Sequence, residues 1–218
     1  MVLTLAIDTA TADVVVGIAE GARVLAERRT GGPARHGETV TPAVALVLAE
    51  AGCAIGDLDA LVVGTGPGPF TGLRVGMVSA ASLADALGVP VYGVCSLDAV
   101  VLGLSDWTGT TVVATDARRR EVYWAIYVNG ERVAGPSVDT PAELLDRLRA
   151  APADRVVGAG AVLYDLPGAL AAGPTVAGLL AAAGPARTDR RPAAPLRAAY
   201  LRRPDAVELA ARTPAGRP

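Results

Sequence analysis

The residues whose types and spacing could do chemistry fall in one glycine-rich segment and in two similar hairpins. The segment Gly64–Gly76 reads GTGPGPFTGLRVG and lies between a predicted buried strand and a predicted helix. The backbone N–H groups of such a loop can hold a phosphate or a carboxylate, and Arg74 could add its charge. Alternatively, Gly66, Gly68 and two prolines only shape a tight connection, because proline lacks the N–H donor. The spacing leaves both interpretations open.

The two hairpins repeat one pattern. Residues 3–24 and 111–133 each contain an apolar run ending in aspartate, a polar turn, a second β-rich run and Gly-x-Arg-Val. Asp8 and Asp116 are 108 residues apart, and one residue inserted after the second run aligns the ends of the two segments. A unit repeated at half the chain length predicts two related α/β lobes, with an aspartate from each at the mouth of the cleft between them. A chance match between β-rich segments is the alternative.

Three consecutive arginines, Arg118–Arg120, follow Asp116 in the predicted turn of the second hairpin. At a cleft they could hold a phosphate or an RNA backbone. A solvated turn is the commoner outcome for such a run, so both interpretations stay open.

Composition excludes several classes of chemistry. The net charge of the 218 residues is −2, so no overall positive field marks a nucleic-acid binder, and another subunit would have to supply most of the phosphate binding. All 20 basic residues are arginine, which excludes a Walker A loop and Schiff-base chemistry. His36 is the only histidine, so a His-x-x-x-His metal site is excluded, and a loop or helix-start role is favoured for it.

The expected location is the cytoplasm. Cys53 and Cys95 are too few for a disulfide framework, and we expect no secretory leader. The apolar stretch Leu73–Val91 is interrupted by Arg74 and Asp85, so we expect no membrane span.

Apolar periodicity predicts an α/β protein with a first lobe over residues 1–100, a second over 101–212 and a frayed tail over 213–218. In the first lobe we expect strands at 2–7, 14–19, 23–29, 60–63 and 90–94, and helices at 40–51 and 71–87, the latter capped by Thr71. In the second we expect strands at 112–115, 121–128 and 155–159, a helix at 141–150 begun by Thr140, a helix-compatible stretch at 168–184 and a linker at 184–195. The last helix could pack back on the first lobe.

The predicted helix Thr71–Leu87 is apolar or small almost all round. Gly72, Gly76, Ala80 and Ala84 form a stripe of small residues at intervals of four. Small residues let another backbone come close, so the stripe could face a partner helix. The alternative is that this chain covers both faces of the helix itself.

Four segments in this order closely resemble the TsaB (YeaZ) family: AIDTAT at 6–11, the block at 64–76, DARRREVYWAIY at 116–127 and AAYLRRPDA at 198–206. The resemblance implies an actin/hexokinase/Hsp70-like fold of two lobes, each with a mixed sheet and flanking helices. It also implies a non-catalytic, cofactor-free role in making N6-threonylcarbamoyladenosine in tRNA. The partners would be the catalytic paralogue TsaD and the ATPase TsaE, with a homodimer in isolation, tRNA reached only through the complex, and no membrane contact.

The resemblance also suggests site residues, none of them catalytic, cofactor-binding or metal-binding. Those expected to bind a partner, through the two helices of the first lobe, are Val40, Val44, Val47, Gly72, Arg74, Gly76, Ala80 and Ala84. Those expected to line a vestigial nucleotide or anion cleft are Asp8, Thr9, Thr11, Gly66, Gly68, Asp116 and Arg118.

The chain departs from active members of the wider fold, whose first phosphate loop usually reads Asp-x-Gly-Thr. Here Ala10 stands at the glycine position and adds a Cβ where backbone should approach phosphate. A small-molecule kinase or ATPase is therefore the weaker alternative, and a glycoprotease-like peptidase is weaker still, because no metal pair or triad supports it. Nucleotide turnover would favour the kinase, whereas complex formation without turnover would favour the scaffold.

Overall fold

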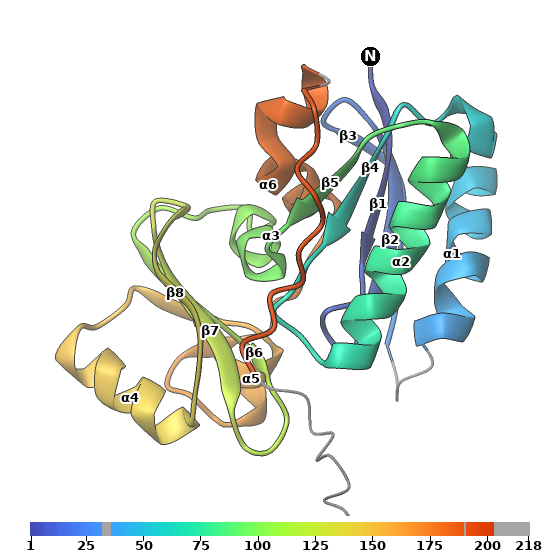
Figure 1. Ribbon diagram of the computed structural model, residues 1–218. Helices are drawn as coiled ribbons and strands as arrows, with labels where there is room; N and C mark the ends of the chain where they lie inside the picture. Colours follow the sequence, from blue (N-terminus) through green and yellow to red (C-terminus); the bar gives the residue numbers. More distant parts are fainter. Residues whose placement is uncertain (32–35, 190, 203–218) are drawn as a thin grey trace, which may run out of the picture.

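The computed structural model describes residues 1–31, 36–189 and 191–202, which form two five-stranded mixed sheets (Figure 1). The first sheet contains β1 (Leu3–Asp8), β2 (Val14–Glu20), β3 (Arg23–Thr30), β4 (Ala60–Gly64) and β5 (Val91–Val94). The second contains β6 (Thr110–Asp116), β7 (Val122–Val128), β8 (Glu131–Asp139), β9 (Arg155–Val157) and β10 (Ala169–Leu170). The helices are α1 (His36–Ala51), the short 3-10 helix η1 (Ile55–Asp57), α2 (Phe70–Leu87), α3 (Ser96–Leu102), α4 (Pro141–Ala150), α5 (Ala159–Leu163) and α6 (Val176–Thr188).

The two sheets have the same topology, which confirms the prediction of two related lobes. Their strand orders are β3-β2-β1-β4-β5 and β8-β7-β6-β9-β10. In each, the first three strands are antiparallel, and the fourth and fifth run parallel to the first. One detail of the sequence match is wrong: Asp8 pairs with Val15 but Asp116 pairs with Val122, so the turn of the second hairpin is one residue shorter than that of the first.

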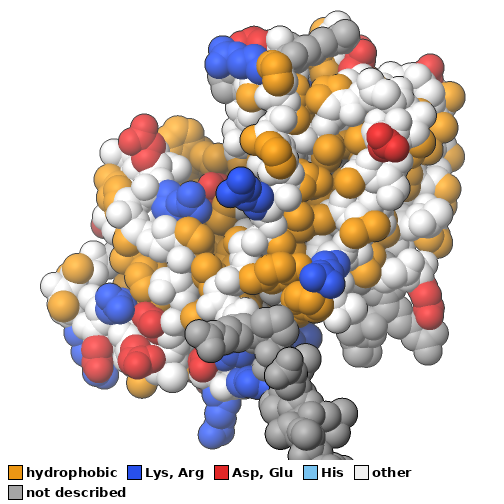
Figure 2. All heavy atoms as spheres, in the orientation of Figure 1, with side chains coloured by type: hydrophobic (Ala, Val, Ile, Leu, Met, Phe, Trp, Pro, Cys, Tyr) orange, Lys and Arg blue, Asp and Glu red, His pale blue; other side chains and the backbone are white. Residues whose placement is uncertain are grey.

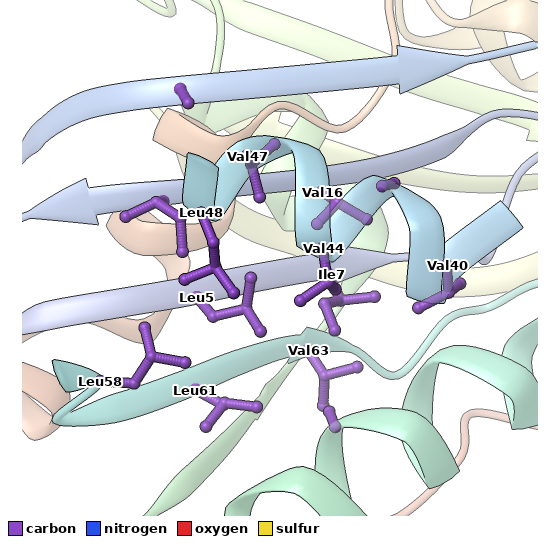
Figure 3. Close-up of a cluster of buried hydrophobic side chains, with 14 of the residues drawn as sticks. Leu5, Ile7, Val16, Val40, Val44, Val47, Leu48, Leu58, Leu61 and Val63 are labelled. Carbon is purple, nitrogen blue, oxygen red and sulfur yellow. The ribbon is translucent and has the colours of Figure 1, made fainter. Parts of the chain in front are cut away.

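Helices cover both faces of the first sheet, and for that reason its central strands are apolar almost throughout. Leu5 and Ile7 of β1 point to the face under α1 and α2, beside Val63 of β4 (Figure 3). Ala6, between them, points to the opposite face and packs with Leu179 of α6. The alternation along one strand therefore supplies two cores at once.

The lobes exchange their last helices. Leu97, Val100 and Val101 of α3 follow the first sheet in sequence but pack on the second, against Val113 and Tyr127. The helix α6 follows the second sheet and packs on the first. These two helices contact each other, and Figure 1 shows α6 above α3 and beside the first sheet. Each sheet thus depends on a helix from the other half of the chain.

Several sequence predictions of elements need correction. Residues 168–184 are not one helix, because β10 occupies Ala169–Leu170 and α6 begins only at Val176. The expected linker from 184 is still helical as far as Thr188, with a break at Gly184. Helix α2 begins at Phe70, so Thr71 is not its cap. The strand β8 and the short helices α3 and α5 were not predicted.

The start of α4 follows the prediction. The hydroxyl of Thr140 accepts a hydrogen bond from the Glu143 N–H, and the Glu143 carboxylate accepts one from the Thr140 N–H at 2.8 Å. This reciprocal capping box satisfies two backbone donors that the helix itself cannot. The predicted tail 213–218 lies outside the described residues. Among the helices of residues 1–31, 36–189 and 191–202, none is both long and apolar enough to cross a bilayer.

Candidate functional site

The carboxylate of Asp8 is held inside the first lobe. Asp8 ends β1 and is fully buried. Its Oδ1 accepts a hydrogen bond from the Ala10 N–H at 2.9 Å, and its Oδ2 accepts one from the Ser96 hydroxyl at 2.5 Å. A buried carboxylate needs such donors, because a buried charge without hydrogen bonds destabilises the fold by several kcal/mol. Asp8 thus fastens the start of α3 to the end of β1.

The glycine-rich segment packs against the turn that follows Asp8. The Thr9 hydroxyl donates to the Gly72 carbonyl at 2.8 Å and accepts from the Gly76 N–H at 3.1 Å. A Cβ on Gly68 would collide with the Ala10 backbone, and one on Gly76 with Thr9. The glycines are therefore required where two backbones approach closely. Gly66, also buried, adopts a positive φ of 93° in the same loop.

Asp116 ends the equivalent strand of the second lobe but is only partly buried. Its Oδ1 accepts from the Arg118 N–H at 2.8 Å, which repeats the Asp8–Ala10 hydrogen bond, and from the Tyr164 hydroxyl at 3.3 Å. The Arg118 guanidinium lies 3.6 Å from its Oδ2. The duplication therefore extends to the hydrogen bond within each hairpin turn.

A cavity of about 260 Å³ lies between the lobes. Three segments line it: the start of α2, the β6–β7 turn and the C-terminal residues 200–202. Of the cleft residues predicted from sequence it brings together Gly68 and Arg118, whereas Asp8, Thr9, Thr11, Gly66 and Asp116 do not line it. Thr11 instead bonds to the backbone of Asp13.

The C-terminal segment supplies cavity residues that the sequence analysis did not select. The Ala199 N–H donates to the Thr65 carbonyl at 2.8 Å, which holds this segment beside the glycine-rich loop. Tyr200 stacks on Phe70 with ring centroids 5.1 Å apart, and its hydroxyl accepts from Arg74 at 2.9 Å. Arg202 donates to the Ala117 carbonyl at 3.1 Å and pairs with Glu121 of the second lobe. The segment AAYLRRPDA at 198–206 was the only signal for it in the sequence.

The residues expected to bind a partner need correction, because most of them form the core of this chain. Val40, Val44 and Val47 project from α1 onto the first sheet (Figure 3), and Ala80 and Ala84 of α2 belong to the same cluster. Gly72 and Gly76 are buried against Thr9. Of the eight, only Arg74 is exposed, and it lies over the Phe70 ring. The stripe of small residues therefore serves packing within the chain.

The outer faces of α1 and α2 carry exposed residues instead. On α1, Pro42, Ala45, Leu46 and Ala49 are exposed, with Leu46 at 56 %. On α2, Val78 is 61 % exposed. The two helices lie side by side, and Figure 2 shows that few charged side chains interrupt the hydrophobic and uncharged atoms on the visible face of this lobe. We call Pro42, Ala45, Leu46, Ala49 and Val78 the outer helix face.

Cys95 precedes α3 close to the contact between the lobes. Burial, with the negative charge of Asp98 adding to it, raises the pKa of its thiol to about 11, from 9.0. At pH 8 only about one Cys95 in a thousand is the reactive thiolate. We therefore expect Ellman's reagent to label Cys95 at pH 8 about a hundredfold more slowly than a free thiol. Because the unfolded thiol ionises first, Cys95 should also lower stability as the pH rises from 9 to 11. Labelling of Cys95 at the rate of a free thiol would contradict this.

Among residues 1–31, 36–189 and 191–202, no three His, Cys, Asp or Glu side chains are grouped so as to hold a metal ion.

The chain is similar to known proteins in both its sequence and its fold. The family model described as TsaD, tRNA N6-adenosine threonylcarbamoyltransferase, matches residues 29–187. An uncharacterized protein of Mycobacterium tuberculosis is 51% identical over 210 residues, which are 94% of each chain.

One further relative in sequence and two solved structures are also similar to this chain. The tRNA threonylcarbamoyladenosine biosynthesis protein TsaB of Escherichia coli is 37% identical over 142 residues, which are 64% of this chain and 61% of that protein. The crystal structure of a Pseudomonas aeruginosa protein similar to the peptidase YeaZ superposes with a TM-score of 0.73 at 30% identity, covering 90% of this chain and all of that one. YeaZ of the same organism gives the same TM-score at 28% identity. The chain therefore belongs to the TsaB (YeaZ) group of the TsaD-type tRNA threonylcarbamoyltransferase family.

Proposed function

We propose that this chain is a non-catalytic subunit of the machinery that forms threonylcarbamoyladenosine in tRNA. In this proposal it binds the catalytic paralogue TsaD through the outer helix face, works with the ATPase TsaE in the same cytoplasmic assembly, and forms a homodimer through the same face when TsaD is absent. The observation that carries the proposal is that face, a group of exposed apolar side chains on two adjacent helices of a chain in the TsaB group.

The state of Asp8 supports a role without catalysis. An acid, base or metal ligand at this position would have to reach the substrate. Here both carboxylate oxygens accept hydrogen bonds from the chain itself, and the residue is fully buried. The glycine-rich loop also covers the turn after Asp8, since Gly68 lies directly on the Ala10 backbone. A phosphate would have to displace that loop before it could reach the turn.

The energetics of burial support the choice of the outer helix face. Leu46 and Val78 are more than half exposed, although apolar side chains of this size gain about 1.5–3 kcal/mol when fully buried. The small side chains of Ala45 and Ala49 leave room for a partner helix to come close. Glu50 pairs with Arg28 at 2.7 Å, so its charge is balanced within the chain.

Replacing Val78 by arginine tests the proposal. The substitution places a charge at the centre of the expected interface, and we expect binding to TsaD of the same organism to weaken by about 30-fold or more. Because Val78 is 61 % exposed, the melting temperature should change little. Co-expression followed by size-exclusion chromatography with light scattering measures both the heterodimer and the homodimer.

Val133→Arg is the matched control, because Val133 is 60 % exposed but lies on β8 of the second lobe. It should leave both complexes intact. If Val78→Arg also left both complexes intact, the outer helix face would not be the interface. Should the purified chain hydrolyse ATP at about 1 s⁻¹, the kinase alternative would replace this proposal.

A further inference from the structure

The turn between β6 and β7 has an unusual backbone. Arg118, Arg119 and Arg120 have φ values of 62°, 54° and 60°, the left-handed region that glycine and asparagine adopt most readily. Each such residue costs on the order of 1 kcal/mol, and strain of this kind gathers at ligand-binding sites. A turn that served only to connect two strands would be more stable with glycine or asparagine at these positions. We therefore attribute the presence of arginine at these three positions to what the side chains bind and not to the backbone conformation.

Positive charge converges on the cavity beside this turn. Arg118 and Arg119 line it from the second lobe, and Arg202 lines it from the C-terminal segment. Among the described residues that line it, none is acidic, although the whole chain carries a net charge of −2. Asp116 and Glu121 lie close by and pair with Arg118 and Arg202. The cavity thus concentrates cationic groups that the composition does not predict.

The opposite wall of the cavity adds two features that suit a nucleotide. The 18-residue helix α2 begins there after Pro69, with no side chain capping its first N–H groups. These groups favour an anion. Phe70 and Tyr200 also line the cavity and are 39 % and 42 % exposed. Exposed aromatic rings beside arginines are the usual platform for bases of single-stranded nucleic acids.

We propose that this cavity binds single-stranded RNA, with a backbone phosphate between the β6–β7 turn and the start of α2 and the adjoining base on Phe70 or Tyr200. The volume of about 260 Å³ accommodates part of one nucleotide rather than a larger enclosed ligand. The inference rests on the proposed function, because that function supplies the RNA. It makes the chain a direct contributor to RNA binding and not only a scaffold.

Fluorescence anisotropy with a labelled ten-nucleotide oligouridylate tests the inference on the whole chain. We expect weak binding that decreases with salt, with a slope of log K against log salt of about −0.7, since one phosphate is neutralised. The double variant Arg118→Asn and Arg119→Asn should bind about tenfold more weakly or worse and lose most of that slope. Asparagine tolerates the left-handed backbone, so the variant should melt no lower than the parent.

Two further variants separate stacking and general charge. Phe70→Ala should weaken binding by about fivefold or more with an unchanged salt slope. Arg149→Gln removes an arginine that is 75 % exposed on α4, away from the cavity, and should change nothing. An equal loss in Arg149→Gln, or no RNA binding by the parent chain at 20 mM salt, would overturn the inference. Complete displacement of the RNA by equimolar ADP would assign the cavity to a free nucleotide and overturn it equally.

Partner binding distinguishes this inference from the proposed function. The arginine double variant should still co-elute with TsaD, and Val78→Arg should still bind the oligonucleotide. If the parent chain bound RNA but not TsaD, the proposed function would fail alone. If it bound TsaD but not RNA, only the inference would fail.

Discussion

Replacing Gly64 by alanine is expected to lower the melting temperature of this protein by about 10 °C. Gly64 ends β4, and a Cβ there would overlap the Oδ2 of Asp8 and lie 2.7 Å from the Ser96 hydroxyl. The Asp8–Ser96 hydrogen bond could not form in its present geometry, and a buried carboxylate would lose one of its donors. The loss of a hydrogen bond to a charged group costs about 1.5–3 kcal/mol, and the steric overlap adds about 1–3 kcal/mol. Each kcal/mol shifts the melting temperature of a chain this size by about 2–4 °C.

Differential scanning calorimetry of Gly64→Ala and Gly56→Ala provides the comparison. Gly56 lies in η1, and a Cβ there would meet no atom within 4 Å. Gly56→Ala should therefore melt within about 2 °C of the parent, or slightly above it, because alanine reduces the entropy of the unfolded chain. Equal melting temperatures for the two variants would show that the Asp8–Ser96 contact contributes little to stability.

Replacing Ala80 by tryptophan should destabilise the first lobe and not act on an interface. Ala80 of α2 is fully buried on the side of the helix that faces the first sheet, in the same cluster as Val44 and Leu61. Overpacking in a core typically costs 1–3 kcal/mol, and a side chain as large as tryptophan should reach about 3 kcal/mol or more. The melting temperature should then fall by at least about 6 °C.

Val78→Trp is the matched variant for this prediction. It introduces the same side chain two residues earlier on α2, where the parent residue is 61 % exposed. Circular dichroism melting should show a large loss for Ala80→Trp and almost none for Val78→Trp, whereas light scattering should show loss of complexes for Val78→Trp. The reverse pattern would mean that the small residues of α2 face a partner after all.

Local patterns in the sequence were sufficient to predict an architecture of two related α/β lobes. Mainly apolar runs that end in Asp8 and Asp116, together with the repeated turn, predict two related lobes, and the topology of the sheets confirms them. The capping box of Thr140 and Glu143 could be predicted for the same reason, since the interacting residues are three apart. The strand β8 was missed because it is a mostly half-exposed edge strand that contains Gly135 and Pro136, which sequence patterns assign to turns.

Only the tertiary structure decided what the functional candidates contact. A stripe of small residues such as Gly76 and Ala80 permits close approach by any backbone. The sequence carries no information on whether that backbone belongs to the same chain. In the structure, Gly76 lies against Thr9, which is 67 residues away in the sequence. Helices α3 and α6 change lobes, and Tyr200 meets Phe70 across 130 residues, because burial of apolar surface does not depend on distance along the chain. The sequence by itself therefore determined most of the strands and the longer helices, the duplication and the family resemblance, whereas the fold decided which faces remain exposed and which arginines converge on one cavity.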